Sequence, residues 1–172
     1  MQIKLAETER EFEQIHALNY KIFVEEIPQH SVRKDKKLVD PFHKQNVYFI
    51  ALFQGNLIGM VCYNCHRPYS LEKKKVNIDA CISKGVKTAE IRLLAVEKKW
   101  RNSKLTYKLL KALIKDLILK EIHLGFISAT TRQSDFYKKL GFTSFGNIVG
   151  KEGAFYQPMY IEVENLKREL HP

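Results

Sequence analysis

The chain has 172 residues, of which 45% are apolar and 28% are charged. This length fits one ordinary domain, residues 1–172, and the composition is that of a globular protein that needs no disulfide framework. No apolar run approaches the about 20 residues that span a bilayer. The acidic start also lacks the apolar core of a secretory signal peptide, so we expect a cytoplasmic protein. The formal net charge of +10 indicates an acidic partner.

The first half of the chain predicts a helix, a long loop and a β-hairpin. Residues 7–27 carry apolar side chains at helical spacing, with Thr8 as a candidate N-cap and Pro28 as a stop signal. The polar residues 29–46 predict a loop long enough to have a function. Two β-rich runs then flank Gln54-Gly55-Asn56, which is a hairpin signal.

The second half predicts alternating strands and helices. A basic segment, residues 66–87, precedes them and contains a short helix or strand near 76–82. The predicted elements are a strand at 88–96, a helix at 104–120, a strand at 123–130, a helix at 132–140 ended by Gly141, and strands at 143–149 and 154–163. Strand–helix–strand connections imply parallel pairing in the middle, with antiparallel strands on both sides. The predicted fold class is therefore α+β, with a mixed central sheet flanked by helices.

Three local sequences stand out within this order. The strand at 89–96 reads A-E-I-R-L-L-A-V, the turn after it begins W-R-N-S-K-L-T, and residues 134–142 read S-D-F-Y-K-K-L-G-F. Together with the element order, they resemble the GNAT superfamily of N-acyltransferases over nearly the whole chain. The resemblance implies a single domain that takes an acyl group from acetyl-CoA, a longer acyl-CoA or an acyl-phosphopantetheine, and that needs no metal or haem.

In that superfamily the strand ends in a bulge whose backbone holds the pantetheine arm of the donor. The resemblance therefore implies donor contacts at Leu94, Ala95 and Val96. It also implies that Glu90 is a general base, because an amine acceptor must lose a proton before it attacks a thioester. The alternative is that Glu90 forms an ion pair with Arg92, which points to the same face of the strand.

The turn after the strand corresponds to the family's Arg/Gln-x-x-Gly-x-Gly/Ala loop, which cradles the pyrophosphate of coenzyme A with backbone amides and a helix N-terminus. Lys104 and Thr106 stand where the family has small residues. One prediction is that the Lys104 ammonium and the Thr106 hydroxyl bind the donor phosphate together with backbone amides. The alternative is that this is a solvated helix start that binds no ligand. The predicted cofactor-binding residues are Arg101, Asn102, Ser103, Lys104, Leu105 and Thr106.

The third match places Tyr137 where the family often has the tyrosine that protonates the leaving thiolate. A thiol has an ordinary pKa of about 8.5 and a phenol about 10, so a tyrosine can supply this proton. The family's Asn-x-x-Ala, often found just before, is replaced here by Thr130 to Gln133.

The N-terminal half shows a weaker resemblance to acyl-homoserine-lactone synthases and long-chain N-acyl amino acid synthases. It rests on N-Y-K-I-F-V-E-E, V-D-P-F-H and the hairpin, with Phe23, Glu25, Glu26 and Asp40 at the matching positions. It implies acceptor-binding roles for Phe23, Glu26 and Asp40. The arginine usual on the strand after the hairpin glycine is absent. Because such enzymes take acyl groups from acyl carrier protein, an acidic partner, the lysine-rich helix at 104–120 would fit a docking role.

Two other interpretations of the sequence remain open. The replaced glycines permit a catalytically inactive protein that binds an acyl thioester or a partner. The basic charge permits a nucleic-acid-binding module, although no nucleic-acid motif supports this.

Cys62-x-x-Cys65-His66 matches the c-type haem pattern, but we expect no haem because there is no export signal. A zinc site that adds Cys81 has no specific spacing. We therefore expect no metal.

Overall fold

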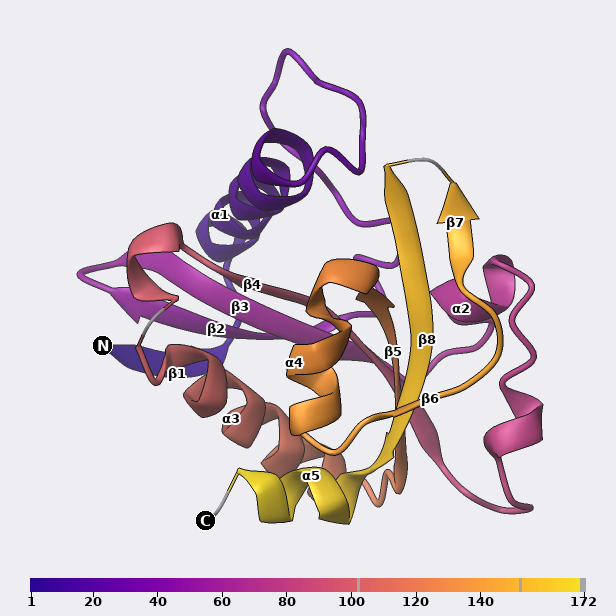
Figure 1. The fold of residues 1–172 in the computed structure, drawn as a ribbon. Coiled ribbons are helices and arrows are strands. Elements are labelled where there is room, and N and C mark those ends of the chain that lie inside the picture. Colours follow the sequence, from indigo (N-terminus) through magenta and orange to yellow (C-terminus); the bar gives the residue numbers. More distant parts are fainter. Residues whose placement is uncertain (102, 152, 171–172) are drawn as a thin grey trace. The chain divides into compact units, whose positions relative to one another are not determined.

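The computed structural model describes residues 1–101, 103–151 and 153–170 (Figure 1). The chain divides into two compact units. The first comprises Met1–Tyr63 and Leu93–Leu113, and the second comprises Asn64–Arg92 and Ile114–Pro172. Strand β4 (Thr88–Val96) and helix α3 (Leu105–Leu119) contribute residues to both units.

The first unit combines antiparallel strands with helical segments. Its elements, besides its parts of β4 and α3, are β1 (Gln2–Leu5), α1 (Glu9–Tyr20), the π-helix η1 (Lys21–Glu26), β2 (Val47–Phe53), β3 (Asn56–Asn64, whose last residue belongs to the second unit) and the 3₁₀-helix η3 (Lys98–Trp100). Strand β2 pairs antiparallel with both β1 and β3. Gln54 and Gly55 have φ angles of 51° and 75°, as a tight hairpin turn of the primed type requires. The predicted hairpin is confirmed.

Helix α1 begins as the sequence predicts, but it does not continue unchanged to Pro28. Thr8 is the N-cap, and with Glu11 it forms a reciprocal capping box. After Tyr20 the chain continues as the six-residue π-helix η1. Apolar spacing does not distinguish these two helix types over so short a stretch. The predicted helix at 7–27 is therefore correct in extent and wrong in regularity.

The core of the first unit explains a glycine within strand β3. A Cβ atom on Gly59 would lie 3.2 Å from Leu109 of α3 and 3.3 Å from the Ala95 carbonyl oxygen of β4. Glycine therefore allows α3 and β4 to approach β3 closely. The buried core cluster consists of Ile15, Leu18, Ile22, Tyr48, Ile50, Leu57, Met60, Cys62 and Ala95.

The second unit contains the parallel pair. Its elements are α2 (Ser70–Lys73), the 3₁₀-helix η2 (Asp79–Cys81), β5 (Leu124–Thr130), the 3₁₀-helix η4 (Thr131–Gln133), α4 (Ser134–Lys139), β6 (Thr143–Ser144), β7 (Val149–Lys151), β8 (Ala154–Glu162) and α5 (Val163–Glu169). Strands β4 and β5 pair in parallel, and β8 lies antiparallel beside the whole of β5 (Figure 1). Strands β6 and β7 pair with β8. The mixed α+β sheet is confirmed.

Three features of the fold differ from the prediction. Strand β1 and helix α5 were not predicted, since both are short and carry charged residues. The strand predicted at 143–149 is reduced to its two ends, β6 and the first residue of β7. Gly141, by contrast, lies just after α4 with φ of 89°, as predicted for a helix-ending glycine.

Candidate active site

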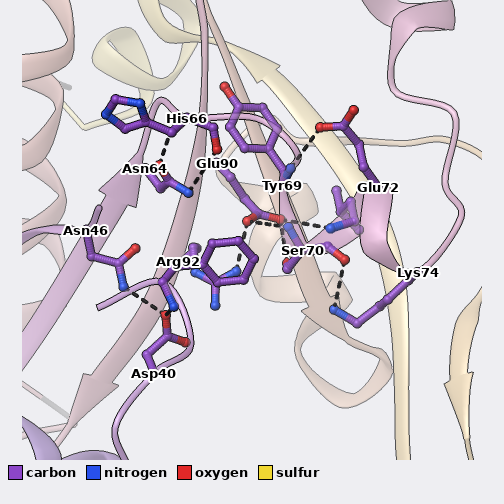
Figure 2. A network of polar contacts seen from close by, with 12 residues as sticks. Asp40, Asn46, Asn64, His66, Tyr69, Ser70, Glu72, Lys74, Glu90 and Arg92 are labelled. Atoms are coloured by element: carbon purple, nitrogen blue, oxygen red, sulfur yellow. Dashed lines mark hydrogen bonds and ion pairs between the residues drawn. The ribbon is translucent and has the colours of Figure 1, made fainter. Parts of the chain in front are cut away.

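Glu90 lies in strand β4 and is completely buried. Its carboxylate accepts four hydrogen bonds within the second unit (Figure 2). The Ser70 hydroxyl donates at 2.6 Å, the Ser70 and Leu71 amides at 3.0 and 3.2 Å, and the Arg92 guanidinium at 2.8 Å. The ion pair with Arg92, which was the alternative interpretation of the sequence, is confirmed.

These contacts have a consequence for the chemistry of Glu90. Four donors occupy the lone pairs of the carboxylate. The same contacts attach the start of helix α2 to strand β4. To act as a general base, Glu90 would have to release one of these donors, so this role stays a prediction.

Strand β4 contains a residue in a conformation that leucine rarely adopts. Leu93 has φ of 50°, which lies in the left-handed region and is typical of irregularities such as bulges. Leu94, Ala95 and Val96, the predicted pantetheine contacts, follow it directly. The break in regular geometry therefore falls immediately before the residues whose backbone was predicted to hold the donor.

Arg101 makes two contacts within the first unit. Its Nε donates to the Val96 carbonyl oxygen at 2.9 Å, and its Nη2 forms a short ion pair with the Glu26 carboxylate. The structure thus brings together a predicted phosphate ligand, a predicted pantetheine contact and a predicted acceptor residue. The Arg101 side chain is 41% exposed, so an incoming anion can reach it.

The start of helix α3 has backbone donors available. The Ser103 hydroxyl accepts from the Leu105 amide at 3.2 Å and donates to the Trp100 carbonyl at 2.6 Å. Its side chain therefore satisfies the first amide of the helix, and a contact of Ser103 with the donor stays a prediction. The amides of Thr106 and Tyr107 have no backbone partner among the described residues, as expected in a first helical turn.

The remaining predicted turn residues differ in their exposure. Lys104 is exposed, Thr106 is half-buried and Leu105 is buried in the core. Asn102 lies outside the described residues.

Tyr137 belongs to helix α4 in the second unit. Its half-buried ring packs edge-on against Phe136 and Phe142, with ring centroids 5.2 and 5.5 Å away. Desolvation raises the pKa of the Tyr137 hydroxyl to about 12. The phenol therefore keeps its proton through neutral pH and is suited to donate a proton, not to accept one.

The other predicted acceptor residues occupy different settings in the first unit. Phe23 packs against the core from η1. Asp40 is buried, and its carboxylate accepts from the Phe42 amide and from the Asn46 side chain, both at 2.9 Å (Figure 2). Asn46 also donates to the Tyr48 hydroxyl at 3.0 Å. The Asp40 side chain thus stabilises the turn that contains it, through Phe42 and Asn46.

A pair of histidines beside this turn was missed by the sequence analysis. The rings of His16, on α1, and His43 are 4.7 Å apart, and His43 Nδ1 lies 3.2 Å from the Tyr48 hydroxyl. Burial, and then the neighbouring His43, lower the pKa of His16. No spacing signal could reveal this contact, because the two residues belong to different elements.

Among the described residues, no three His, Cys, Asp or Glu side chains gather as a metal site would require. Cys62 is buried, whereas Cys65 is exposed. Across the same residues, no helix combines the length and apolarity needed to cross a membrane.

Several solved structures share this fold. A CoA-dependent acyl-homoserine lactone synthase, BjaI, solved with SAM and isopentyl-CoA, is 22% identical with a TM-score of 0.74, over 92% of this chain and 79% of that one. The CoA-dependent synthase MesI is 18% identical with a TM-score of 0.75, over 99% and 96%. FeeM, an N-acyl amino acid synthase from uncultured soil microbes, is 14% identical with a TM-score of 0.75, over 98% and 93%. At these identities the likeness shows the fold alone.

The family assignment comes from the sequence. No curated protein matches the chain. A family model described as the acetyltransferase (GNAT) domain matches residues 7–163, which include every predicted site residue. The chain therefore belongs to the GNAT acetyltransferase family and is an acyltransferase.

Proposed function

We propose that this protein transfers an acyl group from a pantetheine thioester to an amine, and that residues 93–107 hold the donor. The observation that carries the proposal is the arrangement of this segment. The left-handed residue Leu93 precedes the predicted pantetheine strand. Thr106 and Tyr107, whose amides have no backbone partner among the described residues, lie in the first turn of a 15-residue helix. Open amides at a helix N-terminus attract a phosphate.

The donor is either an acyl-CoA or an acyl carrier protein. BjaI and MesI are CoA-dependent synthases, and BjaI was solved with isopentyl-CoA, which supports an acyl-CoA. A carrier protein is acidic and presents a single phosphate. The lysines at the start of α3, all in the first unit, support this second donor: Lys104 and Lys108 are exposed and Lys111 is half-buried. Such lysines would steer an acidic partner.

The reaction needs a nucleophile, a leaving group and two proton transfers. The neutral amine attacks the thioester carbonyl carbon, and a C–N bond forms. The C–S bond then breaks, and its electron pair leaves with the thiolate. The amine loses a proton and the thiolate gains one. We propose no covalent enzyme intermediate, since no cysteine occupies a recognisable nucleophile position.

Tyr137 is the proposed source of the proton for the thiolate. A phenol with a pKa of about 12 is a weak acid for a thiolate whose conjugate acid has an ordinary pKa of about 8.5. The apolar surroundings that raise the pKa of Tyr137 would also raise the pKa of a thiol bound beside it. The difference between the pKa values of the phenol and the thiol would then be smaller.

A panel of donors and acceptors tests this function. Release of free thiol would be measured with acetyl-CoA, long-chain acyl-CoA and acyl carrier protein, each with a set of amines that includes amino acids and SAM. Mass spectrometry would identify the N-acyl product. We expect thiol release that depends on the amine. Tight donor binding without turnover would identify an inactive binding protein. Absence of donor binding, together with salt-sensitive DNA binding, would identify a nucleic-acid-binding module.

A further inference from the structure

The π-helix η1 connects α1 to the long segment that begins at Ile27. Short π-helices are rare and often occur at functional sites. This one carries a cation at its first residue, Lys21, and an anion at its last, Glu26. After it, the Ile27 amide donates to the Ile22 carbonyl at 2.8 Å, and the Gln29 amide donates to the Phe23 carbonyl at 3.1 Å. The conformation of η1 therefore sets how the following segment begins.

Two ion pairs of opposite polarity attach η1 to the turn that follows strand β4. Lys21 contacts the Glu97 carboxylate at 2.6 Å. At the other end of η1, Glu26 contacts Arg101. All four residues belong to the first unit. Because Glu97 and Arg101 flank the 3₁₀-helix η3, the start of the proposed phosphate site and the π-helix are held together at two points.

The Glu26–Arg101 contact is of a kind that a ligand can replace. The two side chains are 26% and 41% exposed, and ion pairs exposed to solvent add little net stability. A phosphate offers the same guanidinium several charged oxygens and can accept two parallel hydrogen bonds. The Glu26 carboxylate therefore binds the Arg101 guanidinium only weakly, whereas a phosphate would bind the same guanidinium well.

We propose that Glu26 and the phosphate of the acyl donor compete for Arg101, so that donor binding releases η1 and the segment after it. The proposal rests on the proposed function, which places the donor phosphate at this turn. Once Glu26 is released, Lys21–Glu97 still attaches the first residue of η1, so its C-terminal end moves first. Binding of the donor thereby loosens the start of the segment that follows η1, at Ile27 to Gln29.

The effects of the Glu26–Arg101 ion pair and of the donor on each other are linked and equal in size. Formation of the Glu26–Arg101 ion pair lowers the affinity for the donor by the same factor by which bound donor lowers the stability of the ion pair.

Three matched variants of the full chain test the competition: Glu26→Gln, Glu25→Gln and Lys21→Gln. Glu25 is the exposed neighbour of Glu26, and its substitution removes the same charge without touching Arg101. The Lys21 substitution breaks the other ion pair of η1. Coenzyme A and 4′-phosphopantetheine would be titrated into each variant, and hydrogen–deuterium exchange of residues 21–29 would be measured with and without coenzyme A.

We expect the Glu26 variant to bind both probes about two- to five-fold more tightly than wild type, the range that an exposed ion pair supplies. Glu25→Gln and Lys21→Gln should leave probe affinity within error of wild type. Coenzyme A should raise exchange in residues 21–29 of wild type. In Glu26→Gln, exchange should already be high without ligand and should not rise further.

The alternative outcomes separate the two proposals. If all variants bind the probes and Glu26→Gln is no tighter than Glu25→Gln, the competition is refuted and the proposed function stands. If Lys21→Gln tightens binding as much as Glu26→Gln, general loosening of η1 explains the effect and the competition is again refuted. If no variant binds either probe, both proposals fail.

Discussion

Two carboxylates predicted to serve the reaction are held in opposite ways. Glu90, in the second unit, is completely buried and accepts four hydrogen bonds. Glu26, in the first unit, is exposed and pairs with an exposed arginine. A buried group with every partner in place is costly to disturb, whereas an exposed pair can exchange its partner for a ligand. The comparison indicates that Glu90 mainly stabilises the fold. Glu26, by contrast, can lose its partner when a ligand such as the donor phosphate binds.

The largest expected effect is that of Glu90→Gln on stability. An amide in this position would turn an NH₂ group toward one of the present donors and would remove the negative charge that pairs with Arg92. We expect the free energy of unfolding, measured in urea, to fall by about 3 kcal/mol. Glu26→Gln is the matched control and should change it by less than about 1 kcal/mol.

A different result would reverse this comparison. If Glu90→Gln unfolds like wild type but loses activity with a changed pH–rate profile, the carboxylate is primarily a general base. Its contacts with Ser70 and Leu71 would then be incidental to stability.

Tyr137→Phe should affect turnover and not binding. Removing the hydroxyl deletes a proton donor while its aromatic packing remains, so we expect kcat to fall about 10²-fold with little change in donor affinity. Steady-state kinetics and calorimetric titration of coenzyme A would measure the two quantities. An unchanged kcat would remove Tyr137 from the mechanism.

Glu11 provides a third carboxylate that sharpens the comparison. Its carboxylate accepts from the Glu7 and Thr8 amides and from Lys4 at 2.8 to 3.1 Å. The Glu7 amide, and then Lys4, lower its pKa from 4.5 to about 2. Because the folded-state pKa is depressed, the stabilisation is fully present above about pH 4.5 and is lost as pH falls toward 2.

Glu11→Gln should therefore cost about 1 kcal/mol at pH 7, mainly through the lost cap. It should cost progressively less at lower pH, measured by urea unfolding between pH 7 and 3. An equal cost at all pH values would mean that the charge of Glu11 contributes nothing.

The smallest expected effect is that of Lys104→Glu on donor affinity. Lys104 is exposed at the start of α3, so its contribution is a screened attraction for phosphate. We expect a several-fold loss of coenzyme A affinity at about 0.01 M salt and a much smaller loss at about 1 M, where the Debye length is only about 3 Å. A loss independent of salt would place Lys104 outside the phosphate site.

Local chemistry explains which parts of the molecule could be predicted. Thr8, the Gln54–Asn56 turn and Gly141 act through nearby backbone, and strand β4 and helix α3 have strong apolar patterns. The family motifs then predicted site roles for Tyr137 and the turn, and these roles stay predictions. Of the partners of Glu90, Arg92 was predicted from the strand pattern, whereas Ser70 and Leu71 could not be, because they lie in a segment without regular patterning. The Glu26–Arg101 pair joins residues 75 positions apart, and the positive φ of Leu93 contradicts the preference of leucine.

The most direct test of the central claim compares two thioester donors that differ by one phosphate. Acyl-4′-phosphopantetheine and acyl-pantetheine would be assayed for thiol release under identical conditions, with the acceptor found in the donor and acceptor panel. If the turn at residues 101–106 holds the donor phosphate, kcat/KM should be about 10-fold higher for the phosphorylated donor, and Lys104→Glu should narrow the difference. Equal kcat/KM values for the two donors would contradict the account.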